Sequence, residues 1–286
     1  MKRILKSQPE PNELSSYIAT RPCSHNKHTW DAFKKHKVKK VAVQKKLRND
    51  QKGLCAYCEI DMLEVSSAVQ NSNCSTQPVI VSDFRVDHFH PKSDNLPQPN
   101  YWELRWDNLF ACCMGGSARY VVDSQRFTVD HLERTCDVPK DSRILDSIVL
   151  NPMQIPAFPS LFSYNNSDGR LEVATVNCQS AGVNATIAQN SIDEFHLNSK
   201  RLRDFRREAI KGVNTAIRKE VQLVATQRVD TNFVDSLDIS AWQTIFKTIA
   251  KQFFVSGSDW PPFFTAIRSY LGQAAEEQLQ AINYDG

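Results

Sequence analysis

The sequence predicts an α+β protein with a core of short elements followed by a predominantly helical C-terminal region. Seven of the eight cysteines and many turn-forming residues fall within residues 55–185. Beyond residue 186, apolar residues such as Ile210, Val213 and Ile217 recur at three or four positions, the spacing of one buried helix face. Hydrophobic residues make up 41 % of the chain and charged residues 23 %, which is typical of a soluble globular protein.

Residues 1–54 are expected to form a basic, helical N-terminal segment. A short helix is expected around Leu14–Thr20, and Trp30 and Phe33 are candidates to anchor this segment to the core. The lysine-dense stretch Lys34–Lys52 carries apolar residues along one face, which predicts an amphipathic helix. The first 50 residues hold 13 Lys and Arg against 4 Asp and Glu, whereas the rest holds 22 against 28. This basic segment indicates either phosphate contacts or a solvated helix face.

The predicted core, residues 55–185, opens with a tight turn and contains several short elements. Gly53 precedes the first cysteine pair and suits such a turn. A surface loop is expected at Asn71–Ser75, where Cys74 lacks a partner at ligand spacing, and a short strand at Val79–Val81. Residues 114–135 are interpreted as an insertion, and Asp168-Gly169 as a hairpin turn.

Residues 186–286 are expected to form a helical region. One long helix should run from Asn198 towards Ala225, and a second should span roughly Ser240–Phe254. Pro261-Pro262 should break the chain before a last helix from about Phe263. This region is a candidate docking surface for a partner or, equally, an ordinary packed helical subdomain.

The cysteines suggest a structural zinc site. Zinc prefers four thiolate or imidazole ligands, commonly supplied as two pairs on tight turns. Cys55 and Cys58 form a regular first pair, and a later pair would combine Cys136 with either Cys112 or Cys113. The alternative is that the first two are buried or redox-active thiols. The chain start has no apolar segment of signal-peptide length, so we expect a cytoplasmic protein with reduced cysteines.

Asp87-His88 lies between the two groups of thiols and suggests hydrolytic chemistry. Histidine is suited to activating water near neutral pH, and a carboxylate suits Mg²⁺ or Mn²⁺. A bend is required here, because neighbouring residues on a regular strand point in opposite directions. His90 competes for the role of base, although a surface or substrate-contacting histidine is the plainer interpretation. Lys92 and Lys140 are candidate phosphate contacts or simply solvated charges.

The combination of Asp87-His88, Trp106-x-Asn108-Leu109 and Cys136-x-x-x-Lys140 resembles the HNH endonuclease superfamily, with its ββα-metal core. The fuller sequence around these motifs is similar to PtuB, the HNH component of Septu antiphage systems that also occurs beside some retrons. The resemblance implies that His88 is the general base, that Asp87 binds a catalytic Mg²⁺ or Mn²⁺, and that Asn108 orients the loop carrying the histidine.

The same resemblance selects Cys113 as the third zinc ligand and assigns Asp137 to the third motif position. The sequence departs from the superfamily in two ways. A long insertion splits the last thiol pair, and an aspartate stands where a histidine or asparagine is usual. Asp137 is therefore only a candidate ligand of the catalytic ion.

These features predict a metal-dependent HNH endonuclease acting as an antiphage effector. The resemblance implies a separate PtuA-like ATPase partner, and the chain itself contains no Gly-x-x-x-x-Gly-Lys-[Ser/Thr] motif. A retron reverse transcriptase with its RNA/DNA product is a further candidate partner, and no membrane association is expected. The substrate is DNA or RNA, including tRNA. The alternative is a zinc-containing nucleic-acid-binding module without catalysis. Base deamination is disfavoured because His88 does not begin a His-x-Glu motif.

Overall fold

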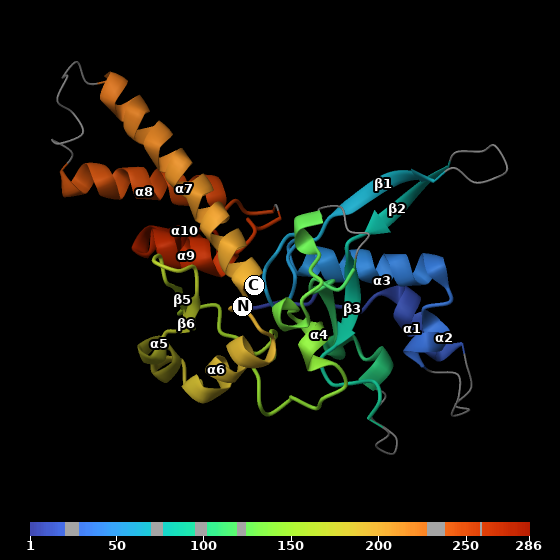
Figure 1. Cartoon of the computed structure of the whole chain (residues 1–286). Helices are drawn as coiled ribbons and strands as arrows, with labels where there is room; N and C mark the ends of the chain where they lie inside the picture. The colour runs from blue at the N-terminus through green and yellow to red at the C-terminus, as the bar shows by residue number, and fades with distance from the viewer. Residues whose placement is uncertain (21–28, 70–76, 95–101, 119–123, 228–237, 258) are drawn as a thin grey trace.

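The structure is a computed structural model that describes residues 1–20, 29–69, 77–94, 102–118, 124–227, 238–257 and 259–286. Within these ranges it combines helices with three separate two-stranded sheets, consistent with the predicted α+β class. The C-terminal helices gather at one end and the β1–β2 ribbon projects at the other, with β3 and α4 between them (Figure 1). The expected loop at Asn71–Ser75, with Cys74, falls outside the described residues.

The N-terminal segment forms helices α1 (Asn12–Ala19), α2 (Trp30–Phe33) and α3 (Lys37–Asp50). Both predicted helices are thus confirmed, and Trp30 and Phe33 are buried as expected. Helix α3 buries Val43, Gln44 and Leu47, whereas Val38 and Val41, which were expected on the apolar face, are exposed. Its lysines are exposed or half-buried. The segment therefore packs on the core through one apolar face and presents its positive charge outward.

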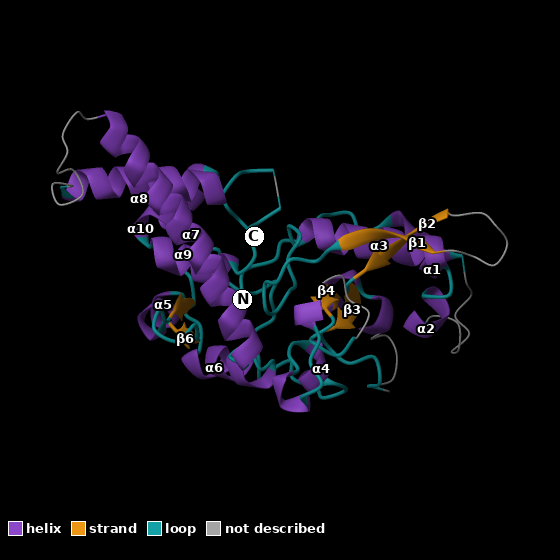
Figure 2. Ribbon diagram, turned by 45° about the horizontal axis from the view of Figure 1, so that its top comes forward, coloured by secondary structure: helices purple, strands orange, loops and turns teal. Residues whose placement is uncertain are grey.

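The central part of the chain is built from two antiparallel pairs of strands. Strands β1 (Glu64–Val69) and β2 (Gln77–Ser82) form the ribbon, so the strand expected at Val79–Val81 is present. Strands β3 (Phe84–His88) and β4 (Leu109–Cys113) pair with Phe84 opposite Cys113 and His88 opposite Leu109. The short helix α4 (Asp137–Lys140) lies close to this pair, apart from the other two sheets (Figure 2).

The predicted hairpin is formed by β5 (Phe162–Tyr164) and β6 (Leu171–Val173), with Gly169 at φ +81° in its turn. Helix α6 (Ala185–Glu194) begins where the helical region was expected, but α5 (Thr175–Ser180) lies in a stretch that was expected to be extended. The remaining helices are α7 (Lys200–Gln227), α8 (Ile239–Phe253), α9 (Phe264–Leu271) and α10 (Gln273–Ala281). The expected single last helix is in fact two, because the chain bends at Gly272 with φ +55°.

The buried apolar residues form two clusters. One joins α1, α3, β3, β4 and the β5–β6 hairpin, and it contains the cysteines that flank the Asp-His pair. The other lies among α7, α8, α9 and α10, with Ile210, Val213 and Ile217 on the buried face of α7 as the spacing predicted. Among the described residues, no helix is long and apolar enough to cross a membrane.

Candidate active site and zinc centre

The first cysteine pair lies on a turn that follows α3 directly. Gly53 adopts φ +78° and its N–H bonds to the carbonyl of Arg48, which ends the helix. The N–H of Cys55 bonds to the carbonyl of Ile60, and the chain reverses between them. Both thiols consequently point to the same side of a rigid turn, as predicted for a pair of metal ligands.

The second pair is assembled across the insertion. The N–H of Thr135 donates to the carbonyl of Gly115 at 3.0 Å, so the two ends of the insertion lie side by side. Gly115 has φ +57°, and a Cβ there would lie 2.3 Å from the Thr135 carbonyl oxygen. The close approach therefore requires glycine, and it brings Cys136 beside Cys113 despite 22 intervening residues.

The sulfur atoms of Cys55, Cys58, Cys113 and Cys136 all lie within 4.8 Å of one another and are buried. Three separations are 3.6 Å, 3.7 Å and 3.8 Å. A tetrahedral zinc with Zn–S bonds of about 2.3 Å places its sulfurs about 3.8 Å apart. The four thiols therefore fit a zinc ion, with Cys113 rather than Cys112 in the cluster, as the resemblance implied.

Strand β3 ends at His88, which is 7 % exposed and lies edge-on to the ring of Trp30 at 5.2 Å. Its Nε2 lies 3.0 Å from the backbone carbonyl of Glu103. A carbonyl only accepts hydrogen bonds, so Nε2 carries the proton and the neutral ring keeps a lone pair on Nδ1. Burial lowers the pKa of His88 to about 4, which keeps the imidazole neutral at physiological pH.

The side chain of Asn108 holds the loop that follows His88. Its Oδ1 accepts the N–H of His90 at 2.7 Å, and its Nδ2 donates to the carbonyls of His90 at 3.0 Å and Trp102 at 2.7 Å. These three bonds bring the chain after β3 against the short turn before β4. These bonds fit the loop-orienting role that the resemblance implies for this asparagine, which stays a prediction.

The carboxylate of Asp87 is held by two buried side chains. Lys140 Nζ lies 2.9 Å from each of its oxygens, and Tyr57 donates its hydroxyl to Oδ2. Lys140 also donates to the carbonyls of His88 and Phe89 and is only 1 % exposed. In this arrangement it supports the end of β3 and is not exposed for the phosphate contact predicted for it.

Asp137 forms a two-point ion pair with Arg85. Arg85 Nε donates to Oδ2 at 2.6 Å and Nη2 donates to Oδ1 at 2.8 Å. The thiol of Cys112 donates to the same Oδ1 at 3.3 Å. Burial, together with the nearby Asp87 carboxylate, raises the pKa of Asp137 to about 6, and the bonds with Arg85 oppose that rise. The carboxylate is thus ionised at neutral pH and accepts three hydrogen bonds from protein donors.

A pocket of about 560 Å³ opens beside these groups, and it is lined by Arg85, Val86, Asp87, His88, Pro91, Lys92, Ser93, Asp137, Val138, Asp141 and Ser142. The predicted base and both predicted carboxylates therefore share one cavity. Asp87 is already paired with Lys140 and Asp137 with Arg85, so the two carboxylates do not fit a catalytic Mg²⁺ or Mn²⁺ in this arrangement. Within the described residues, the metal-binding donors converge only at the four thiols.

Of the other two candidates, Lys92 lines the pocket and His90 does not. Lys92 is 42 % exposed and pairs with Asp31 of α2 at 2.9 Å. His90 is buried with its ring tilted against that of Trp102, its Nε2 lies 2.8 Å from Asp94 and its Nδ1 lies 3.0 Å from Asp146. Because each ring nitrogen faces a carboxylate, neither nitrogen of His90 is open to a water molecule in this arrangement.

Sequence reasoning missed the partners of the motif residues. Tyr57 lies between the first two thiols, and its contact with Asp87 spans 30 positions with no local signal. Arg85 could have been noticed, because residues two apart on a strand share a face and Asp87 was already a candidate. The contact of His88 with the backbone carbonyl of Glu103 could not be predicted, because a backbone carbonyl is present in every residue.

No protein-family model and no solved structure matches the chain. The chain is similar to the "Retron Ec83 putative HNH endonuclease" of Escherichia coli, with 27 % identity over 237 residues, covering 77 % of this chain and 83 % of the relative. The two-strand and helix arrangement around Asp87 and His88, with thiols beside it, is compatible with that name. The name of this relative agrees with the resemblance to HNH nucleases that the sequence motifs indicate, and it places that relative in a retron.

Proposed function

We propose that the chain is an endonuclease that hydrolyses phosphodiester bonds of DNA or RNA as the effector of an antiphage defence system. The observation that carries this proposal is a neutral His88 with an unprotonated Nδ1 on a pocket that also contains Arg85 and Lys92. The relative's name supports both the nuclease activity and the setting beside a retron.

In the proposed reaction, His88 acts as the general base. Its Nδ1 accepts a proton from a water molecule, the resulting hydroxide attacks phosphorus, and the bond to the leaving oxygen breaks. That oxygen leaves with a proton from solvent. Asn108 keeps the surrounding loop in place, and the cations of the pocket attract the phosphodiester.

The resemblance implies a Mg²⁺ or Mn²⁺ ion that would stabilise charge on the phosphate, with Asp87 as its first candidate ligand and Asp137 as its second. Because Lys140 and Arg85 occupy these carboxylates, no step of the proposed reaction is assigned to the ion. A zinc ion on the four thiols is proposed to be structural, because four protein ligands leave no coordination position for water. It would hold the two halves of the site together.

The proposal is tested by incubating the purified chain with plasmid DNA and total tRNA, with Mg²⁺, with Mn²⁺ or with EDTA. Cleavage by the wild-type chain that disappears in His88→Ala, with zinc content and melting temperature retained, is the expected outcome. Cleavage by His88→Ala at the wild-type rate would remove His88 from the mechanism. The EDTA arm decides whether a divalent ion is needed.

A second candidate is a nucleic-acid-binding zinc module without catalysis. The pairing of both pocket carboxylates with lysine and arginine favours it, because such pairing leaves no open cation site. Binding of DNA or tRNA with no cleavage under any of the metal conditions, and with unchanged affinity in His88→Ala, would favour this candidate over the nuclease.

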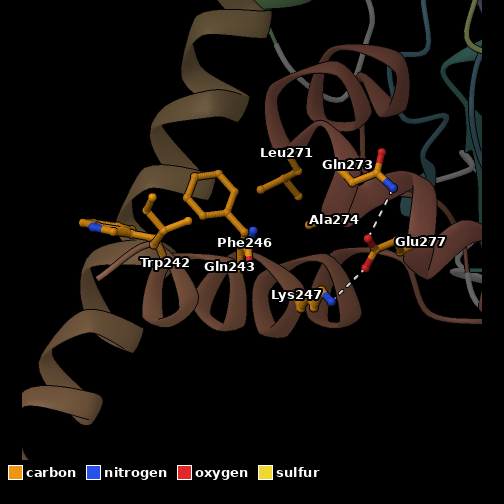
Figure 3. A pocket seen from close by; sticks show the side chains of 9 residues that line it. Trp242, Gln243, Phe246, Lys247, Leu271, Gln273, Ala274 and Glu277 are labelled. Atoms are coloured by element: carbon orange, nitrogen blue, oxygen red, sulfur yellow. Dashed lines mark hydrogen bonds and ion pairs between the residues drawn. The ribbon is translucent and has the colours of Figure 1, made fainter. Parts of the chain in front are cut away.

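The proposed partners are a PtuA-like ATPase and, from the relative's name, a retron reverse transcriptase with its RNA/DNA product. The C-terminal helices are the candidate docking surface for the ATPase. A pocket of about 440 Å³ there is lined by Trp242, Phe246 and Leu271, and a Lys247–Glu277 ion pair lies beside it (Figure 3). Trp242→Ala should weaken binding of the ATPase and leave the chain's own cleavage rate unchanged.

A further inference from the structure

The ion pair between Arg85 and Asp137 is placed inside the candidate active site. Both residues line the pocket that contains His88. The Arg85 side chain is 37 % exposed, whereas that of Asp137 is 12 % exposed. The carboxylate is therefore the more deeply buried partner, and the guanidinium lies nearer to the solvent of the pocket.

The carboxylate of Asp137 is itself held firmly. Its residue follows Cys136, one of the four clustered thiols, and its Oδ1 accepts from the thiol of Cys112 in addition to Arg85. Strand β4 places Cys112 directly opposite Arg85 in the register of the sheet. The carboxylate of Asp137 is thus held by the thiol of Cys112 and by its position next to Cys136. A carboxylate held in this way fixes the plane of the guanidinium that pairs with it.

A guanidinium has five N–H donors, and the bonds with Asp137 use one on Nε and one on Nη2. Three donors remain on an arginine whose orientation is already set. A planar fork of this kind matches two oxygens of a phosphate, and arginine prefers such two-point recognition. The ordering cost of binding is low, because the side chain is immobilised before the ligand arrives.

We propose that Arg85 binds the scissile phosphate and that Asp137 is the positioning residue that aims it. This assignment rests on the proposed nuclease function and gives the third motif position a role other than metal binding. Arg85 would also stabilise the additional negative charge that develops on the phosphate oxygens as hydroxide attacks.

The test compares Arg85→Gln, Arg85→Lys, Asp137→Asn and the double variant Arg85→Gln/Asp137→Asn. Cleavage rates are measured on plasmid DNA and tRNA over a series of Mg²⁺ concentrations. Binding of a short fluorescent oligonucleotide is measured in EDTA. Arg170→Ala serves as a control, because its exposed pair with Asp168 lies outside the pocket. Zinc content and melting temperature are recorded for each variant, and Asp137→Glu replaces Asp137→Asn if the latter does not fold.

We expect Arg85→Gln to lower the cleavage rate by roughly 10²-fold, the usual cost of losing one donor to a developing charge. It should also weaken oligonucleotide binding, whereas Arg85→Lys should keep part of both. Asp137→Asn should be slower than wild type, and its rate should vary with Mg²⁺ concentration in the same way as the wild-type rate. The double variant should be no slower than Arg85→Gln, because Asp137 acts only through Arg85.

A wild-type rate and affinity in Arg85→Gln would overturn the assignment. So would a further rate loss in the double variant together with a raised Mg²⁺ midpoint, since Asp137 would then be a metal ligand. If the wild-type chain cleaves nothing but Arg85→Gln still weakens binding, the nuclease proposal fails while phosphate binding by Arg85 stands. Absence of both cleavage and any Arg85-dependent binding overturns both.

Discussion

Acidification should destabilise the protein through His88. The unfolded chain exposes this side chain, whose ordinary pKa is 6.5, whereas burial lowers it to about 4 in the folded protein. Between these two values the unfolded state binds the proton and the folded state does not. The contribution of His88 to the free energy of unfolding is therefore fully present above pH 6.5 and is lost progressively as the pH falls towards 4.

The size of the effect follows from the same two values. Each tenfold change in proton affinity is worth about 1.4 kcal/mol, so the full loss from this histidine is about 3 kcal/mol. His88 is 7 % exposed and Trp30 packs against its ring, which leaves little room for solvent to reduce the effect. A loss of this size is a large part of the stability of an ordinary domain.

The assay is urea unfolding of the wild-type chain and His88→Gln, followed by intrinsic fluorescence, at several pH values from about 7.5 to about 4.5. Glutamine retains a donor for the Glu103 carbonyl but does not titrate. Protonation of the thiols affects both proteins equally, so the difference between them isolates the histidine. An identical pH dependence in the two proteins would refute a buried, neutral His88.

Three further predictions concern the zinc site and its surroundings. Cys113→Ser should lose zinc while Cys112→Ser retains it, measured as metal content after purification, since only the former lies in the four-thiol cluster. Lys140→Met should destabilise the fold by about 3 kcal/mol in denaturant unfolding, because it leaves a buried carboxylate unpaired. Gly115→Ala should lower the melting temperature far more than Gly182→Ala; both have positive φ, but only the first meets a backbone atom.

Much of the fold was predictable because its signals are local. The buried stripe of α7, the hairpin turn at Asp168-Gly169 and the first thiol pair each depend on residues a few positions apart. The break at Gly272 is also local, but a single glycine often occurs within a helix. Only the structure, in which Gly272 has a φ of +55°, shows that this glycine separates two helices.

The partners of the candidate site could not be predicted in the same way. Lys140 and Asp87 are 53 positions apart, and Arg85 and Asp137 are 52 apart. A sequence gives no sign of which carboxylate a particular cation will meet, and a lone lysine is more often solvated. Lys140 was predicted either to contact phosphate or to be a solvated charge, and it is instead buried against Asp87.

The zinc cluster and the pocket are best understood as one unit. Helix α4 has four residues, too few to be stable alone, so its position depends on tertiary contacts. Cys136 precedes its first residue and lies in the thiol cluster, while Asp137 and Lys140 reach across to Arg85 and Asp87 on β3. A metal bound by the thiols would therefore hold α4 against β3, and removing it would release both ion pairs of the pocket together. Chelation of zinc should thus weaken the site through these two pairs even where the rest of the core remains folded.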